Sequence, residues 1–275
     1  MSAFINWLVS PLQYEFMQRG MVAAVLAGIL CAIVGTYVVL RGMAFFGDAL
    51  AHTILPGVAI GYLVSGGARD TLFWWALGTA ILAALGIGAV SRQSAIKEDT
   101  AIGVIFAGMF ALGVALISTV RSYAVDLSHF LFGDVLGVSS QSLWLILIFG
   151  GLVLLTVGAF YKEFLTISFD PILAATLRLP VNLLNNLLLG LIAVTVAVSL
   201  QTVGVALMVA MLVTPAATAS LLTRRLPSMM ALAALLATLS SVIGLYLSYY
   251  LSIASGAAIV LTATAFFAAV FVWKR

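Results

Sequence analysis

Residues 41–62 read RGMAFFGDALAHTILPGVAIGY and place two ionisable side chains, Asp48 and His52, inside an otherwise apolar run. Positions four apart lie on one face of an α-helix, so the carboxylate and the imidazole face the same side. Keeping an ionised aspartate near the centre of a bilayer costs roughly 2.5 to 3.5 kcal/mol on insertion scales, so such a residue normally faces a pathway or a partner. The pair predicts a site for a metal ion.

Pro56 lies four residues after His52 and has no amide hydrogen to return to the His52 carbonyl. A helix through this region therefore predicts a free oxygen on the same side as the imidazole. The alternative is a purely structural role for the pair. In that case Asp48 would be a helix N-cap that follows Gly47, and His52 would be hydrogen-bonded between helices.

The composition excludes a soluble globular protein. Of the 275 residues, 64% are hydrophobic and only 8% are charged. Continuous apolar runs of about 20 residues are typical of membrane-spanning helices, whereas a barrel would alternate. We therefore expect an all-α fold, a polytopic transmembrane helical bundle that forms a single domain over residues 1–275 in the lipid bilayer. The net charge of +3 gives no indication of a nucleic-acid partner.

Eight to nine hydrophobic segments are expected, and the least certain is the seventh. They lie at 20–40, 45–65, 72–91, 100–120, 142–161, 182–200, 204–222, 229–250 and 253–273. Pro215 interrupts the seventh, which leaves two alternatives there, a continuous span and a broken or re-entrant helix. Residues 1–18 mix aromatic and polar side chains, which favours an interfacial helix. Cys31 is the single cysteine, so there is no internal disulfide.

Basic residues indicate the orientation, because they gather in cytoplasmic loops. If the loop after the first span is cytoplasmic, nine of the twelve lysines and arginines lie inside. The inside set is Arg41, Arg92, Lys97, Lys162, Arg178, Arg224, Arg225, Lys274 and Arg275, and the outside set is Arg19, Arg69 and Arg121. Segment 162–180 is then cytoplasmic, and segment 122–141 is extracellular or periplasmic.

Two loop segments carry further candidate residues. In segment 162–180, KEFLTISFDPILAATLRLP, Asp170 and Pro171 predict the N-cap and first residue of a short helix that ends before Pro180. Such a helix is either a plain connector or a docking element for a motor protein. In segment 122–141, Asp126, His129 and Asp134 are candidate contacts for a metal at the outer mouth. The alternative for these three residues is helix capping or contact with a partner protein.

Several motifs are absent from the sequence. It contains no G-x-x-x-x-G-K-[ST] phosphate loop, no H-E-x-x-H and no G-x-S-x-G. These absences argue against an enzyme and against ATP hydrolysis by this chain. A secondary cation transporter or channel that uses Asp48 as a relay is the alternative function. An intramembrane metalloprotease is disfavoured, because the chain has only two histidines, predicted on separate segments.

Four stretches together resemble the membrane permease of the manganese, zinc and iron ABC importers. They are RGMAFFGDALAHTILPGVAIGYL at 41–63, KEDTAIGVIFAGMFALGV at 97–114, VDLSHFLFGDVLGVS at 125–139 and LQTVGVALMVAMLVTPAATA at 200–219. The resemblance covers nearly the whole chain and implies the fold of a type II ABC importer permease in a bacterial-type cytoplasmic membrane. The stretch VDLSHFLFG at 125–133 is more similar to the manganese branch than to the zinc branch.

The resemblance also implies partners and residue roles. It implies a homodimer, two cytoplasmic ATP-binding subunits that hydrolyse ATP, and an extracellular or periplasmic metal-binding protein. No cofactor is expected to be permanently bound, and the transported ion is Mn, Zn or Fe. Asp48 and His52 match the family's metal positions, so a dimer axis along the pore would offer two aspartates and two histidines. A permease for a metal chelate is the alternative within the same family.

The family's coupling helix corresponds to residues 169–180 of this chain. The residues implied to contact the ATPase are Asp170, Pro171, Ala174, Ala175, Leu177, Arg178 and Leu179. Relatives commonly end this helix with Leu-Gly-Leu-Pro. This chain departs from that pattern, because Arg178 stands where the glycine would be.

Overall fold

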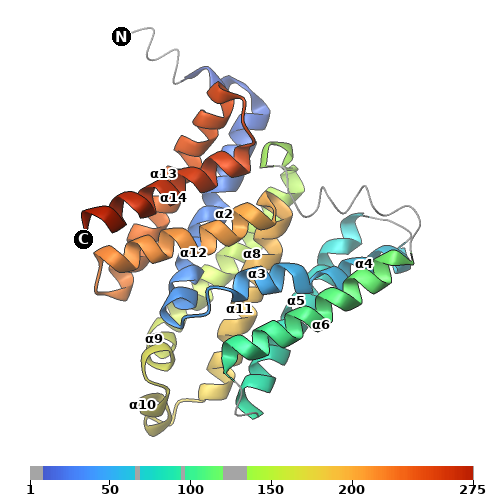
Figure 1. Ribbon diagram of the computed structural model, residues 1–275, viewed down its shortest axis with the longest axis vertical. Coiled ribbons are helices and arrows are strands. Elements are labelled where there is room, and N and C mark those ends of the chain that lie inside the picture. Colours follow the sequence, from blue (N-terminus) through green and yellow to red (C-terminus); the bar gives the residue numbers. More distant parts are fainter. Residues whose placement is uncertain (1–8, 66–68, 94–96, 120–134, 275) are drawn as a thin grey trace. The chain divides into compact units, whose positions relative to one another are not determined.

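The computed structural model describes residues 9–65, 69–93, 97–119 and 135–274, and all regular elements in these ranges are helical (Figure 1). The first half contains η1 (Pro11–Gln13), α2 (Glu15–Leu40), α3 (Phe46–Thr53), α4 (Leu55–Ser65), α5 (Arg69–Gln93) and α6 (Glu98–Ser118). The second half contains η2 (Val135–Gly137), α8 (Ser140–Ala159), α9 (Tyr161–Phe169), α10 (Pro171–Thr176), α11 (Val181–Val203), α12 (Val205–Leu222), α13 (Leu226–Leu251) and α14 (Ser255–Trp273).

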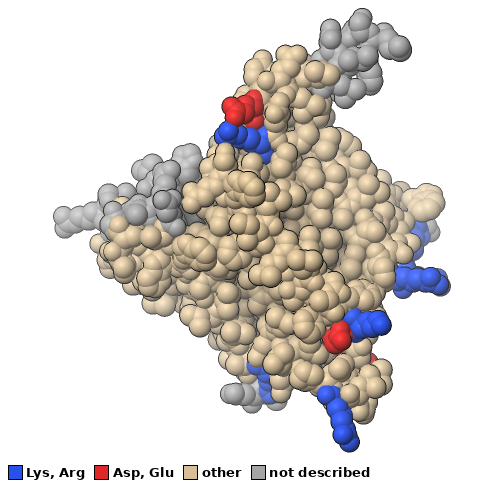
Figure 2. Space-filling model, turned by 180° about the vertical axis from the view of Figure 1, so that it is seen from behind, with Lys and Arg blue, Asp and Glu red and all other residues tan. Residues whose placement is uncertain are grey.

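Within the described ranges, nine segments are long and apolar enough to cross a membrane, as the sequence predicts. Helices α3 and α4 together form one of them, Phe46–Ser65. Figure 2 shows broad areas of surface without a charged side chain, as expected for helices that contact lipid. The chain is a multi-pass helical membrane protein.

The N-terminal region differs in part from the expected interfacial helix at 1–18. Residues 1–8 lie outside the described ranges, and Pro11–Gln13 forms a single 3-10 turn. Residues 15–18 belong to α2, which begins five residues before the predicted start of the first span. No glycine or proline separates Glu15 from the span, and an i, i+4 ion pair between Glu15 and Arg19 favours the helical conformation there.

The seventh segment is the continuous span and not the broken or re-entrant alternative, because α12 runs without interruption through Pro215. Proline removes only one backbone hydrogen bond from the helix. Packing outweighs that loss, since Met208, Met211 and Pro215 are all buried. Gly204, with a φ of +83°, is the single residue that separates the end of α11 from the start of α12.

The chain forms two compact units, and α2, α8 and α11 each contribute to both. Unit 1 comprises residues 1–36, 129–151 and 199–275. In it, α12, α13 and α14 pack against one another. Small residues permit close contact there: a Cβ added at Gly35 of α2 would lie 1.8 Å from the carbonyl oxygen of Leu212, and one at Gly244 would lie 2.4 Å from Cα of Ile259.

Unit 2 comprises residues 37–128 and 152–198. In it, α3, α4, α5 and α6 pack together, and α9 lies beside α10 (Figure 1). Glycines again permit the closest approaches. A Cβ at Gly57 of α4 would lie 2.0 Å from Oγ1 of Thr79 on α5, and one at Gly113 of α6 would lie 2.7 Å from Cβ of Leu55. These contacts hold the helices that surround Asp48 and His52.

Candidate metal site

Asp48 and His52 lie on the short helix α3, as the i, i+4 spacing predicts. The distance from Oδ1 of Asp48 to Nε2 of His52 is 3.7 Å. The side chain of Asp48 is 35% exposed and that of His52 is 28% exposed, so both are reachable from outside the chain. Asp48 is not the N-cap of α3, because Phe45 occupies that position. The capping role considered for Asp48 is therefore not the one observed.

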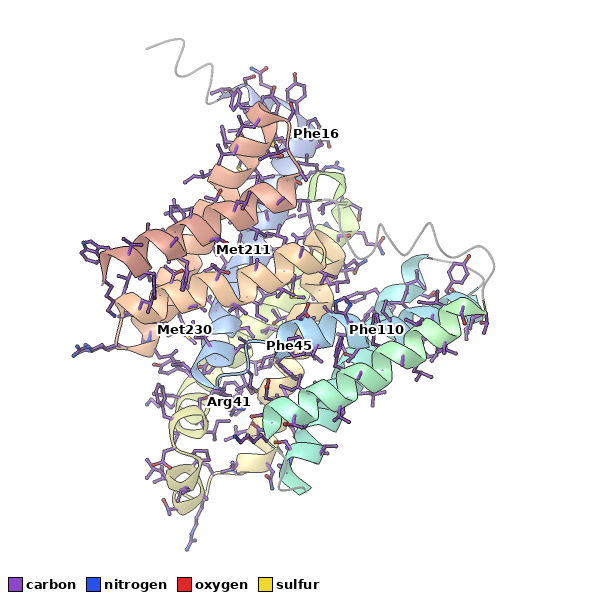
Figure 3. All side chains as sticks on the ribbon, viewed as in Figure 1. Phe16, Arg41, Phe45, Phe110, Met211 and Met230 are labelled. Atoms are coloured by element: carbon purple, nitrogen blue, oxygen red, sulfur yellow. The ribbon has the colours of Figure 1, made fainter. Side chains whose placement is uncertain are left out.

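An aromatic wall on α6 positions the imidazole of His52. The ring centroid of His52 lies 5.9 Å from that of Phe106 and 5.7 Å from that of Phe110, and the two phenylalanine rings stack on each other. Figure 3 labels Phe110 on α6 and Phe45 just before α3. No local pattern predicts this wall, because two phenylalanines in an apolar span look like ordinary packing residues.

The second imidazole nitrogen, Nδ1 of His52, is buried and has no hydrogen-bond partner among the described residues. Histidines that bind metals usually donate this N–H to a carboxylate or carbonyl oxygen, which fixes the ring. Here the ring contacts with Phe106 and Phe110 supply the orientation instead. The observation also disfavours the structural alternative in which His52 is hydrogen-bonded between helices.

The prediction of a free carbonyl oxygen at His52 is wrong. The helix is interrupted at Ile54, whose backbone N–H donates a hydrogen bond to that oxygen. Pro56 has no backbone N–H to donate to the His52 carbonyl. Helix α3 therefore ends at Thr53, and α4 begins at Leu55 with Pro56 in its first turn. The carbonyl oxygen retains its second lone pair.

A single copy of the chain supplies two donor side chains, Asp48 and His52, to the candidate metal site. Within the described residues there is no group of three or more His, Cys, Asp or Glu side chains that could hold a metal ion. Asp126, His129 and Asp134, the candidate contacts at the outer mouth, lie outside the described residues. Carboxylate and imidazole together suit manganese, iron and zinc.

The predicted N-cap in segment 162–180 is confirmed. One oxygen of Asp170, Oδ1, accepts hydrogen bonds from the backbone N–H of Ile172 at 3.0 Å and of Leu173 at 2.9 Å, and Pro171 begins α10. Ala174 is buried, whereas Ile172 is 78% exposed and Leu177 is 59% exposed. Helix α10 thus presents apolar side chains away from its own unit.

Arg178 adopts a left-handed backbone conformation, with a φ of +58°. The N–H of Arg178 donates to the carbonyl of Ala175 at 3.0 Å, and the N–H of Leu179 donates to that of Ala174 at 3.1 Å. This pair of bonds is a Schellman motif, which usually has glycine at the left-handed position. Arginine at this position preserves the Schellman motif, but its Cβ makes the left-handed backbone conformation sterically unfavourable.

We expect Arg178→Gly to stabilise the protein by about 1 kcal/mol, because glycine adopts a positive φ without strain. Thermal unfolding of the purified permease in detergent measures the change. Arg178→Val is the matched control and should destabilise the protein, because a β-branched residue disfavours this conformation more than arginine. Equal stability of all three proteins would contradict the left-handed conformation.

Comparison with known proteins places the chain in a family. A model of the ABC 3 transport family matches residues 13–274. The manganese transport system membrane protein MntC of Halalkalibacterium halodurans is 46% identical over 174 residues, which cover 63% of this chain and 58% of that protein. The manganese import system permease protein ScaB of Streptococcus gordonii is 39% identical over 169 residues, which cover 62% of this chain and 59% of that protein.

Among solved structures, PsaBC from Streptococcus pneumoniae in complex with Fab contains a similar chain. The TM-score is 0.83 at 38% identity, and the match covers 97% of this chain and 95% of that chain. The curated relatives named above are matched over less than two thirds of their own length. The family match, by contrast, includes every described membrane span in full. The chain belongs to the ABC 3 transport family.

Proposed function

We propose that this protein is the permease subunit of an ATP-driven importer of a divalent transition metal, with manganese as the expected cargo. The observation that carries the proposal is the pair of donor side chains, Asp48 and His52, 3.7 Å apart within a membrane-spanning segment. Family membership and relatives named for manganese transport support the same function. The spacing of the two donor atoms suits a single ion, which favours a bare metal over a large chelate as the cargo.

The site is proposed to be completed by a second copy of this chain. Two donors from one chain are too few for a transition metal, and no third His, Cys, Asp or Glu lies close to them among the described residues. Because Asp48 and His52 are partly exposed, a partner copy can approach both. Two copies would offer two carboxylates and two imidazoles to an ion on the axis between them.

ATP is proposed to act on separate subunits, since the sequence contains no phosphate loop. The distribution of basic residues favours a cytoplasmic location for α10. The exposed apolar residues Phe169, Ile172 and Leu177, in α10 and on either side of it, would dock to the ATPase. Ala175 and Leu179 belong to the same docking segment. A metal-binding protein outside the cell would deliver the ion near Asp126, His129 and Asp134.

In this mechanism Asp48 and His52 hold the ion briefly as it passes through the membrane. Binding must be strong enough to replace water ligands and weak enough to permit release. Phe106 and Phe110 restrict the rotation of the imidazole, so the donor nitrogen keeps its direction toward Asp48. Movement of the permease halves, driven through α10, would open the site inward.

The test is metal accumulation by cells that express the full importer, with manganese, iron and zinc supplied in turn. We expect manganese to accumulate, and we expect accumulation to stop when the nucleotide site of the ATPase subunit is disabled. Uptake that continues without a working ATPase would instead identify a secondary transporter or channel. Uptake of a chelate but of no free ion would identify the chelate permease.

Transport is expected to fall at acid pH. A proton and a metal ion compete for the same lone pair of a histidine ligand, so uptake should be lower in acid medium than at neutral pH. The measurement is metal uptake by proteoliposomes containing the whole importer, with ATP hydrolysis recorded in parallel. Unchanged uptake across this range, with steady hydrolysis, would contradict the role of His52.

A further inference from the structure

A cavity of about 390 Å³ lies in unit 2, and neither Asp48 nor His52 lines it. Its polar lining includes Arg41, Arg92, Glu98, Ser168 and Asn185. Figure 3 labels Arg41, which follows the last residue of α2. A water molecule takes up about 30 Å³ in the liquid, so the cavity is large enough for a hydrated ion or a small headgroup.

The charge of this lining is positive, because two guanidinium groups face one carboxylate. Arg41 donates from Nε to Oγ of Ser168 at 3.3 Å and also donates to the side-chain oxygen of Asn185. Arg92 donates to the side-chain oxygen of Asn186 at 2.7 Å. These acceptors are all neutral, and within the described part of the chain neither arginine forms an ion pair with a carboxylate.

The arginines therefore retain both charge and hydrogen-bonding capacity. A guanidinium has five N–H donors, of which Arg41 uses two and Arg92 uses one. Burial lowers the pKa of the Arg41 guanidinium, and the negative charge of Glu98 opposes that shift. An anion in the cavity would replace the solvation that Arg41 loses. A metal cation would be repelled, so this cavity is not suited to the cargo.

The cavity lies at the ends of several membrane spans. Leu40 ends α2, Arg92 lies in the last turn of α5, and Glu98 and Val181 begin α6 and α11. Alternation of the spans places these four ends on one side of the membrane. The ends of spans lie at the depth of lipid headgroups, where basic pockets between helices bind phosphate groups.

We propose that this cavity binds a phosphate-bearing anion, either the headgroup of an anionic lipid or free phosphate, through Arg41 and Arg92. The planar guanidinium matches the oxygens of a phosphate and can bind them in pairs. Glu98 weakens the attraction and thereby limits the affinity. The proposal does not depend on which metal is transported.

The test compares Arg92→Gln with Arg224→Gln in the full-length permease, alone and with its ATPase subunit. Both substitutions remove one exposed positive charge, but only Arg92 lines the cavity. Arg41 is avoided because its hydrogen bonds to Ser168 and Asn185 connect separate segments of unit 2. Glu98→Gln is the opposite variant, since Glu98 is the only carboxylate among the described residues that line the cavity.

One arm of the test measures lipid. Native mass spectrometry counts phosphatidylglycerol retained from mixed vesicles with phosphatidylcholine. The other arm measures thermal stabilisation by inorganic phosphate in a neutral detergent, against chloride at equal ionic strength. In the arm that responds, we expect Arg92→Gln to weaken binding about tenfold, Arg224→Gln to leave it unchanged, and Glu98→Gln to strengthen it about fivefold.

A response to phosphatidylglycerol alone identifies a lipid, and a response to phosphate alone identifies a free anion. Equal binding by wild type, Arg92→Gln and Arg224→Gln would overturn the proposal. So would an equal loss in both variants, which would indicate diffuse surface attraction. Loss of the ligand from the wild type when the ATPase subunit is added would also overturn it, because the partner would then fill the cavity.

Discussion

Replacement of Asp48 or His52 by alanine is expected to reduce metal uptake at least about tenfold while the importer still assembles. In a homodimer each substitution acts twice, so two of four donor groups are lost at once. Changes to residues that only support metal ligands typically cost 10- to 100-fold in affinity or activity, and loss of the ligands themselves should cost no less. The measurement is accumulation of manganese, iron and zinc in cells that contain the whole complex.

The matched control is Asp99→Ala. Asp99 is an exposed carboxylate in the first turn of α6. Asp99→Ala therefore removes one negative charge, as Asp48→Ala does, but at a position outside the proposed metal site. This variant should transport at the wild-type rate. Copurification of the ATPase subunit with each variant checks assembly. If Asp48→Ala and His52→Ala both transported like the control, the pair would be structural and the metal would pass elsewhere.

Hydrophobicity and local residue spacing predicted the membrane spans, the juxtaposition of Asp48 and His52, and the start of α10. Continuous apolar runs located every span in the described part of the chain, because only helices can satisfy the backbone in lipid along a single segment. The i, i+4 spacing placed Asp48 beside His52, and the Asp170-Pro171 pair located the start of α10. Each of these predictions depends on interactions within a few residues, which a sequence displays directly.

The features that the sequence did not reveal depend on tertiary contacts or on unusual backbone. The wall against His52 comes from Phe106 and Phe110, more than fifty residues away along the chain. Helix α12 continues through Pro215 because the surrounding packing outweighs a missing hydrogen bond. Arg178 adopts a conformation that its residue type disfavours. Neither the aromatic wall nor the continuous α12 has a local pattern that distinguishes it from the ordinary alternative, and the only sign of the backbone at Arg178 is the glycine that relatives commonly have there.

Gly57→Ala is expected to destabilise the protein by about 3 kcal/mol, at the upper end of the usual cost of overpacking. The added Cβ would lie 2.0 Å from Oγ1 of Thr79 and 2.5 Å from the backbone carbonyl oxygen of Trp75. Rotation of Thr79 would move Oγ1 away at the cost of its hydrogen bond to Trp75, but Cβ of Thr79 would remain 2.8 Å from the added Cβ. The second clash is with backbone, so α4 and α5 must separate. The measurement is thermal unfolding in detergent.

Gly78→Ala on α5 is the control, because nothing lies within 4 Å of a Cβ at that position. Alanine in a helix interior is favoured over glycine, so this variant should be about 0.5 to 1 kcal/mol more stable than wild type. Thr79→Ala combined with Gly57→Ala should restore only part of the loss, since the Trp75 carbonyl remains. If Gly57→Ala were as stable as Gly78→Ala, α4 and α5 would not be in close contact. Because α4 follows α3 after only Ile54, displacement of α4 should also disturb Asp48 and His52 and lower metal uptake.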